Sequence, residues 1–205
     1  MDIKWIFFDI GSTLVDETEA YNHRAKDMLC QSDVTFSMFD KKRIEFAKQG
    51  YDGNSQAIQF FGLSKTPWHC EDEVPFCDAI PTLQVLKDRN YNLGIIANQV
   101  DGAKQRLQNW DILKFFDVVV TSAEIGVAKP NKIIFEKAVE LAQASWDQCV
   151  MVGDRLDNDI IPAKCLNMKT VWIRQGLARY QSATLADGKA DWIVDNLSQL
   201  TDIFV

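Results

Sequence analysis

The residues able to do chemistry lie in four short segments, and the first of these begins with Asp9. A run of apolar and β-favouring residues over residues 3–8 ends at this carboxylate, and such a run predicts a strand buried on both faces of a parallel sheet. Ligands in such sheets bind beyond the carboxyl ends of the strands. Burying the charge of Asp9 there would cost several kcal/mol unless another group compensates it. Asp9 is therefore a candidate for chemistry, and its partners have to come from elsewhere in the chain.

The other three segments supply possible partners. Asn98 follows a second predicted strand, Lys129 lies in the loop after a third, and Asp154 and Asp159 follow a fourth. Parallel strands bring such ends to one edge of a sheet, where three carboxylates repel one another strongly unless a cation lies between them. Ligands that are all oxygen select a hard ion, and Mg²⁺ is the common choice. A lysine nearby would neutralise a substrate anion or a covalent intermediate.

The four segments lie between predicted strands and helices, which alternate along the chain and would position them. We expect strands over residues 3–8, 91–97, 116–121, 148–152, 170–173 and 192–194. We expect helices over residues 81–89, 102–110, 131–143 and 157–166, the second of them capped by Asp101, and a long polar loop over residues 175–191. This alternation predicts an α/β fold, a three-layer Rossmann-like parallel sheet with helices on both faces.

Residues 16–78 have a different character and predict an insertion. Helical patterns cover residues 17–32, 35–50 and 54–61, and no strong strand pattern lies among them. We therefore expect an α/β core made of residues 1–15 and 79–205. A small helical cap, residues 16–78, is inserted after the first strand.

Composition limits the classes of function. The chain has 205 residues, of which 47% are hydrophobic and 25% charged, as in a soluble globular domain. The formal net charge of −7 argues against a nucleic-acid partner, which needs clustered basic residues, although a bound cation would still admit an anionic substrate. No apolar run approaches the ~20 residues that span a bilayer, and no signal-peptide pattern precedes the first strand. We expect a cytoplasmic protein without a membrane partner.

The remaining cysteines and histidines predict no second chemistry. The five cysteines are an odd number without a disulfide spacing, so we expect reduced and mostly buried thiols. His69, Cys70 and Cys77 lack a fourth metal ligand at a sensible spacing. His23 and Arg24 could reach a substrate from the first inserted helix, but side chains facing solvent are the simpler interpretation.

In this order and spacing, the four segments resemble the motifs of the haloacid dehalogenase-like (HAD) hydrolase superfamily, and the insertion lies where that family places its helical C1-type cap. The resemblance implies a phosphatase of small phosphorylated metabolites, in which Asp9 attacks phosphorus and forms an aspartyl-phosphate that water hydrolyses. It implies these site residues: Asp9 and Lys129 for catalysis; Thr13, Asn98 and Lys129 for the phosphoryl group; and Asp9, Asp154, Asp159 and the backbone carbonyl of Gly11 for Mg²⁺.

Two positions depart from the pattern of the family it resembles. Family phosphatases have a second Asp two residues after the nucleophile, which acts as general acid and base, and this chain has Gly11 there. Losing such a group costs roughly 10²- to 10⁴-fold in rate. The family's Ser or Thr before Asn98 is Ala97, so a hydroxyl that would bind the phosphoryl group is missing. We expect Gly11→Asp to raise activity if the pocket otherwise fits phosphate esters.

These departures leave other functions open. A catalytically weak or silent protein that binds phosphate and metal is the alternative from another class. Dehalogenases of the superfamily also lack the second Asp, but they have a bulky Tyr there and dispense with metal. A phosphonatase-like reaction tolerates a small residue there, but it needs a lysine from the cap. The motifs specify neither the substrate nor the oligomeric state, because specificity depends on how the cap meets the core.

Overall fold

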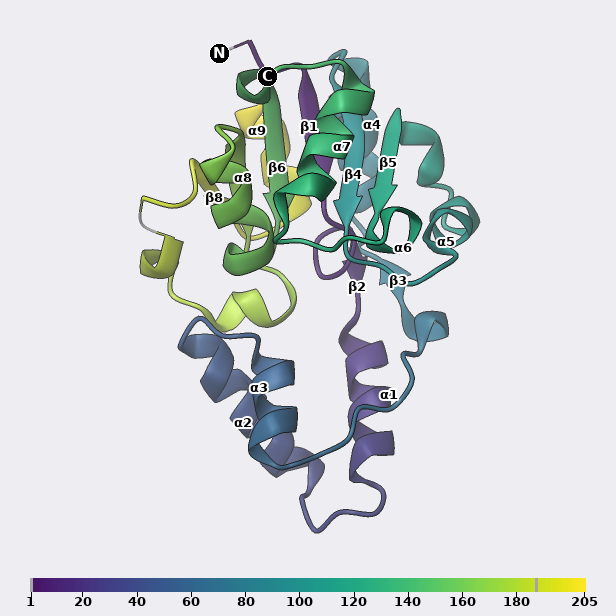
Figure 1. Cartoon of the computed structure of the whole chain (residues 1–205), viewed down its shortest axis with the longest axis vertical. Helices are drawn as coiled ribbons and strands as arrows, with labels where there is room; N and C mark the ends of the chain where they lie inside the picture. The colour runs from purple at the N-terminus through teal and green to yellow at the C-terminus, as the bar shows by residue number, and fades with distance from the viewer. Residues whose placement is uncertain (1, 187) are drawn as a thin grey trace.

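A six-stranded parallel sheet lies at the centre of the computed structural model, which describes residues 2–186 and 188–205 (Figure 1). In spatial order the strands are β5 (Val118–Thr121), β4 (Asn92–Ala97), β1 (Trp5–Phe8), β6 (Cys149–Gly153), β7 (Lys169–Ile173) and β8 (Trp192–Val194). Phe8 of β1 pairs with Ile95 on one side and with Val152 on the other. The carboxyl ends of β4, β1 and β6 therefore lie at the same edge of the sheet.

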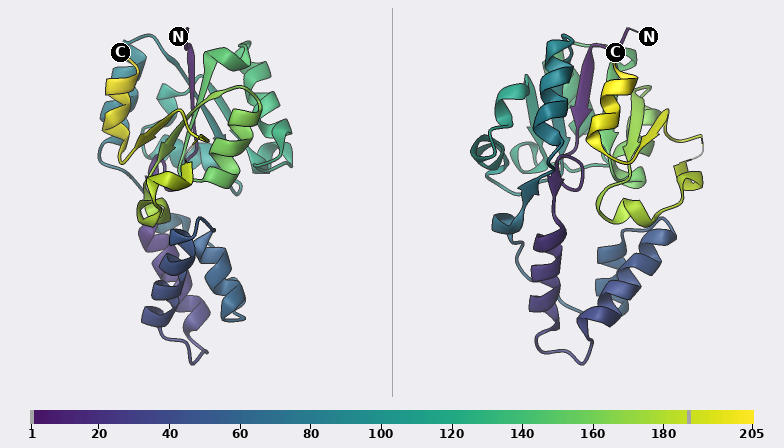
Figure 2. Two further views of the ribbon diagram at one scale, coloured as in Figure 1. Left: turned by 90° about the vertical axis from the view of Figure 1, so that its left-hand side faces the viewer. Right: turned by 180° about the vertical axis from the view of Figure 1, so that it is seen from behind.

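Helices cover both faces of the sheet and give three layers (Figures 1 and 2). The first face packs against α4 (Ala79–Asp88), α5 (Ala103–Asn109) and α9 (Leu200–Ile203). The second face packs against α7 (Lys132–Ala142) and α8 (Ile161–Cys165). Along β1 the side chains alternate, because Ile6 and Phe8 join the first apolar cluster while Phe7 joins the second. The α/β three-layer fold predicted from the sequence is confirmed.

Three helices form the inserted segment beyond the carboxyl ends of the strands (Figure 1). These are α1 (Thr18–Leu29), α2 (Phe36–Lys48) and α3 (Gly53–Phe60), and we refer to them together as the inserted helices. They have an apolar cluster of their own, which includes Leu29, Phe39 and Ile58. Two short antiparallel strands, β2 (Val15–Asp16) and β3 (Val74–Pro75), join the chain where it leaves the core and returns to it. Strands of two residues are too short to show a period in the sequence.

Several element boundaries differ from the prediction. Gly102 with a φ of 83°, rather than Asp101, precedes α5, and no side-chain cap is formed there. α4 begins at Ala79, so Pro81 is its third residue. The helix expected over residues 157–166 is a π-helical turn, Leu156–Ile160, that runs into α8. The polar loop expected over residues 175–191 contains two short 3-10 helices, η5 (Gly176–Tyr180) and η6 (Ala183–Ala186), while residue 187 lies outside the described residues.

The prediction of mostly buried thiols is wrong. All five cysteines are free, but Cys30, Cys77 and Cys165 are exposed and Cys149 is buried. Cysteine packs like a small apolar side chain at Cys149, whereas the exposed positions lie outside the apolar clusters. In the described parts of the chain, no helix has the length and apolarity needed to cross a membrane.

The two residues on α1 that could have reached a substrate make other contacts. Nδ1 of His23 donates to Oδ2 of Asp72 at 2.7 Å, and the His23 ring stacks on His69 with 3.6 Å between the ring centroids. Arg24 lies over the ring of Trp68 and is only partly exposed, so its predicted position in solvent is wrong. The β2–β3 end of the insertion is thus tied to α1 by stacked rings.

Candidate active site

The carboxyl ends of β1, β4 and β6 open onto one cavity of about 140 Å³. Asp9 follows β1 directly, Asn98 follows β4, and Asp154 follows β6. Lys129 and Asp159 also line this cavity. The structure brings these five side chains together, while the roles assigned to them from the sequence stay predictions.

The ammonium of Lys129 is the centre of this cluster. Its Nζ donates to Oδ1 of Asp9 at 2.7 Å, to Oδ1 of Asp159 at 2.6 Å and to the carbonyl oxygen of Ile96 at 2.8 Å. Burial alone would lower the pKa of Lys129, but the charges of Asp159 and Asp9 outweigh burial and raise that pKa above its ordinary value. A permanent positive charge therefore lies beside the predicted nucleophile.

Asn98 holds the backbone of Lys129 in place. Oδ1 of Asn98 accepts the N–H of Lys129 at 2.7 Å, and Nδ2 of Asn98 donates to the carbonyl oxygen of Lys129 at 2.9 Å. This pair of bonds joins the end of β4 to a loop far along the chain. The contact is different from the phosphoryl binding assigned to Asn98 from the sequence, and that role stays a prediction.

Asp159 reaches back over the end of β6 from the π-helical turn. Its Oδ1 accepts from Lys129, and its Oδ2 accepts the backbone N–H of Arg155 at 3.0 Å. A Cβ added at Gly153 would collide with the carboxylate of Asp159. Glycine is thus required at the end of β6, because any side chain there would displace this carboxylate from the cavity.

Three carboxylates lie close enough to share a cation. Asp9, Asp154 and Asp159 each offer one oxygen, and these oxygens lie within 4.8 Å of one another. Burial, followed by the charges of Asp159 and Asp9, raises the pKa of Asp154 well above its usual range. Burial also raises the pKa of Asp159 to about 6, although Lys129 opposes this. A divalent cation would relieve the repulsion, and the all-oxygen donor set fits Mg²⁺.

Thr13 lies apart from the cavity. Its side chain is fully buried, and its hydroxyl has no hydrogen-bond partner within residues 2–186 and 188–205. Thr13 does not belong to the cavity wall formed by its neighbours Gly11 and Ser12. The structure therefore does not bring Thr13 to the other predicted site residues, and its phosphoryl-binding role stays a prediction.

Glu17 is a residue of the site that sequence reasoning missed. It precedes α1, lines the cavity beside Gly11 and accepts a hydrogen bond from Oγ of Ser12 at 3.1 Å. Burial, followed by the charges of Asp9 and Glu73, raises the pKa of Glu17 to about 8. Nothing in the sequence distinguishes Glu17 from an ordinary acid at a helix start, because the space at Gly11 is visible only in three dimensions.

The position of Glu17 changes what we expect of Gly11→Asp. A Cβ added at Gly11 would lie 2.7 Å from both Cδ and Oε2 of Glu17, which is far inside van der Waals contact. The expected gain of activity in that variant therefore requires that Glu17 be moved or removed at the same time.

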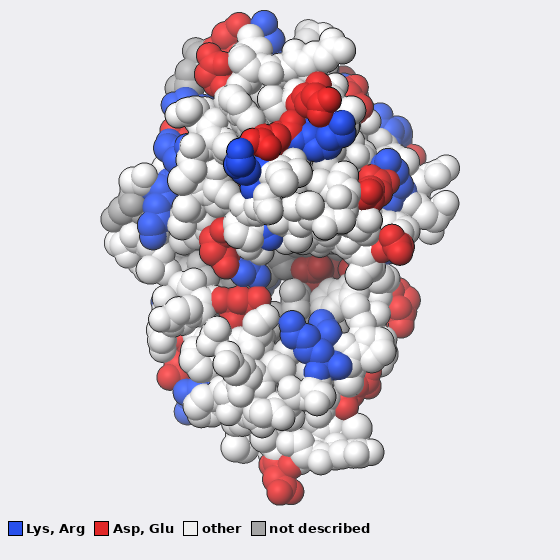
Figure 3. Space-filling view, in the orientation of Figure 1, with Lys and Arg blue, Asp and Glu red and all other residues white. Residues whose placement is uncertain are grey.

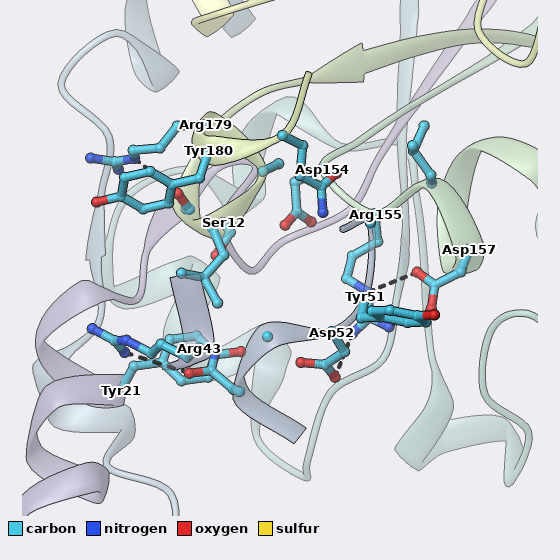
Figure 4. A pocket seen from close by; sticks show the side chains of 18 of the residues that line it. Ser12, Tyr21, Arg43, Tyr51, Asp52, Asp154, Arg155, Asp157, Arg179 and Tyr180 are labelled. Atoms are coloured by element: carbon cyan, nitrogen blue, oxygen red, sulfur yellow. Dashed lines mark hydrogen bonds and ion pairs between the residues drawn. The ribbon is translucent and has the colours of Figure 1, made fainter. Parts of the chain in front are cut away.

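A second cavity, of about 120 Å³, lies between the inserted helices and the core (Figure 4). It shares Ser12, Tyr21, Asp154 and Arg155 with the first cavity. Its wall includes charged and aromatic side chains, namely Tyr21, Arg43, Tyr51, Asp52, Arg155, Asp157, Arg179 and Tyr180. Figure 3 shows a hollow between the core and the inserted helices, with acidic and basic side chains around it. A molecule that extends from Asp9 would meet this polar wall.

Comparison with known proteins decides the family. The model of the haloacid dehalogenase-like hydrolase family matches residues 6–173. The chain belongs to the haloacid dehalogenase-like hydrolases. The resemblance inferred from the four motifs is confirmed, and the protein is an enzyme of this superfamily.

Curated relatives of this hydrolase include several phosphatases. It is 34% identical over 224 residues to the glyceraldehyde 3-phosphate phosphatase of Methanothermobacter thermautotrophicus, with 98% of this chain and 99% of the relative covered. It is 27% identical to a pyrophosphatase of Bacillus mycoides, with 99% of this chain and 97% of the relative covered.

Solved structures share the fold of this hydrolase. A predicted phosphoglycolate phosphatase from Haemophilus somnus superposes with a TM-score of 0.76 at 20% identity, covering 100% of this chain and 99% of that one. A 2-haloacid dehalogenase from Pseudomonas syringae superposes with a TM-score of 0.65 at 23% identity, covering 98% and 97% of the two chains. The same fold thus carries more than one chemistry.

Proposed function

We propose that this hydrolase is a Mg²⁺-dependent phosphatase of a small phosphorylated metabolite and that it forms an aspartyl-phosphate on Asp9. The observation that carries the proposal is the cluster in which Lys129 bonds both Asp9 and Asp159 beside Asp154. This cluster supplies a nucleophile, a fixed cation and oxygen donors for a hard metal ion at one edge of the sheet.

Each residue of the cluster has a defined role in the proposed reaction. A carboxylate oxygen of Asp9 attacks phosphorus, and Lys129 hydrogen-bonds that carboxylate and neutralises charge on the phosphoryl oxygens. Mg²⁺, when bound, supplies further neutralisation of the phosphoryl charge. Asp9, Asp154, Asp159 and the backbone carbonyl of Gly11 are the groups that would hold it.

The relatives and the cavities support a small substrate. Relatives are named for glyceraldehyde 3-phosphate, pyrophosphate and pyrimidine 5′-nucleotides, and all of these compounds carry a phosphoryl group. The two adjoining cavities, about 140 and 120 Å³, suit a phosphoryl group and a compact polar remainder. Tyrosines and arginines around the second cavity could bind hydroxyl or anionic groups of that remainder.

The test is a panel of phosphate esters assayed with Mg²⁺ and with a chelator. We expect turnover that requires Mg²⁺ and that falls at least about 10³-fold in Asp9→Asn, because the nucleophile is lost. Asp195→Asn is the control, since Asp195 is 59% exposed, pairs with Arg174 and lines neither cavity. Wild-type turnover in Asp9→Asn would overturn the proposal.

Gly11 and Ala97 favour a second candidate, a phosphate- and metal-binding protein with little or no turnover. Binding of Mg²⁺ and vanadate, without turnover of any ester on the panel, would support it. Release of halide from a haloacid in the presence of the chelator would instead support a dehalogenase.

A further inference from the structure

We propose that Glu17, at the start of the inserted helices, is the general acid and base that this hydrolase lacks at position 11. The inference rests on the proposed phosphatase function and deepens it, because it assigns proton transfer to a residue of another element.

The carboxyl of Glu17 occupies the space that a side chain at position 11 would fill. A Cβ built on Gly11 would lie 2.7 Å from Cδ and from Oε2 of Glu17, so the two groups exclude each other. An aspartate at position 11 would carry its carboxyl one bond beyond that Cβ. Glycine at position 11 and glutamate at position 17 thus together place one carboxyl next to the point from which an aspartate at position 11 would project its own.

Contacts within the turn hold this carboxyl in place. Ser12 Oγ donates to Oε2 of Glu17 at 3.1 Å, and Ser12 itself adopts a left-handed backbone conformation with a φ of 53°. The carbonyl oxygen of Glu17 accepts the N–H of Tyr21 at 2.9 Å and so begins the first turn of α1. Glu17 lines the same cavity as Asp9.

The other carboxylates that line the cavity either bind Lys129 or belong to the group that fits a cation. Among the described residues, the carboxylates that line it are those of Asp9, Glu17, Asp154 and Asp159. Lys129 binds Asp9 and Asp159, and Asp154 belongs to the group of three that fits a cation. Glu17 is therefore the carboxyl left for proton transfer.

The proton is returned at the end of each turnover. As an oxygen of Asp9 bonds to phosphorus, the bond from phosphorus to the alcohol oxygen breaks, and that oxygen takes the proton of the Glu17 carboxylic acid. The Glu17 carboxylate then accepts a proton from water as the water oxygen attacks phosphorus. The bond from phosphorus to Asp9 breaks, inorganic phosphate leaves, and both side chains return to their starting states.

The test exchanges the carboxyl between the two positions. We expect Glu17→Gln, which keeps the shape of the side chain, to lower kcat by about 10²- to 10⁴-fold. We expect Gly11→Asp to be impaired by its collision with Glu17. The double variant Gly11→Asp with Glu17→Ala should be at least about tenfold more active than Glu17→Ala alone. Glu19→Gln, in the exposed first turn of α1, is the matched control and should keep wild-type activity.

A pre-steady-state measurement separates proton transfer from a structural role. With p-nitrophenyl phosphate, whose leaving group needs little protonation, Glu17→Gln should release a burst of about one equivalent of p-nitrophenol and then turn over slowly, because hydrolysis of the aspartyl-phosphate still needs the base. A structural defect would lower the burst as well and would overturn the inference.

The outcomes separate this inference from the proposed function. If Asp9→Asn abolishes turnover while Glu17→Gln keeps the wild-type kcat, the assignment of Glu17 is wrong and the phosphatase stands. If the double variant is no more active than Glu17→Ala, the assignment also falls. If Asp9→Asn turns over like the wild type, or the wild type turns over no ester, both proposals are wrong.

Discussion

At Lys129, a side chain that is 2% exposed meets two carboxylates and one carbonyl oxygen within 2.8 Å. Removing one partner from a buried ion pair leaves an uncompensated charge, which costs about 3–5 kcal/mol. The loss of Lys129 would leave Asp9 and Asp159 to repel each other next to Asp154. The same side chain is therefore expected to matter for stability and for turnover.

We predict that Lys129→Met lowers kcat at least about 10²-fold and lowers the free energy of unfolding by a few kcal/mol, as in other broken buried pairs. The measurements are phosphatase turnover and denaturant unfolding. Lys132→Met is the control, because the Lys132–Glu136 pair on α7 is 68% and 43% exposed and should contribute at most about 1 kcal/mol. Equal stability of the two variants would contradict the prediction.

At the scale of secondary-structure elements, Asp191, which directly precedes β8, connects that strand to α8 and β7. Its carboxylate accepts from Lys164 Nζ at 2.7 Å and from the N–H and hydroxyl of Thr170 at 2.9 and 3.1 Å. Burial by itself raises the pKa of Asp191, but the bonds from Lys164 and Thr170 outweigh it and hold the pKa below the ordinary value of 3.8. The edge of the sheet is thus stabilised by the ionised form of one residue.

We predict that Asp191→Asn lowers the free energy of unfolding by about 1–3 kcal/mol at pH 7. Because the folded pKa lies below the unfolded one, the contribution of Asp191 is complete above the unfolded value and is lost as the pH falls through the folded value. The difference between wild type and variant should therefore shrink below about pH 4. Chemical unfolding at several pH values measures it.

The control for this prediction is Asp195→Asn. Asp195 pairs with Arg174, but it is 59% exposed, so its removal should change stability little at any pH. A difference between wild type and Asp191→Asn that grows as the pH falls would show that another group carries the effect.

For the molecule as a whole, one ion pair connects the inserted helices to the core across the second cavity. Nη1 of Arg155, next to the candidate metal site, donates to Oδ2 of Asp52 at 2.9 Å. Asp52 also caps α3, because its Oδ1 accepts the N–H of Ser55 at 3.1 Å. These two bonds position α3 over the cavity where the non-phosphoryl part of a substrate would lie.

We predict that Asp52→Asn raises KM about three- to fivefold and changes kcat less, because a partly buried ion pair contributes about 1 kcal/mol. Asparagine keeps the helix cap, so α3 should stay folded. Steady-state kinetics measures both constants. Asp157→Asn removes the other partner of Arg155, within the core alone, and should raise KM less than Asp52→Asn does. Equal changes of KM in both variants would contradict a role for the connection between core and inserted helices.

Local patterns predicted much of the fold and the identity of most cavity residues. Apolar runs located all six strands of the sheet, and burial on both faces accounts for the continuous apolar sequence of the central strands β1, β4 and β6. The ends of those strands located Asp9, Asn98 and Asp154. Sequence patterns predicted helix boundaries less well: Gly102, in a left-handed conformation, precedes α5, where Asp101 was expected to cap it. They also failed to predict that three of the cysteines are exposed. The cytoplasmic location stays a prediction.

The sequence by itself determined that a carboxylate follows the first strand, that Lys129 and two more acids follow later ones, and that position 11 has no side chain. These are properties of single positions, and parallel strands convert them into neighbours at one edge. Only the tertiary structure decided that Lys129 bonds both Asp9 and Asp159, that Asp52 reaches Arg155, and that Glu17 fills the space at Gly11. Such contacts depend on distances and free volume between elements, which no period or spacing along the chain encodes.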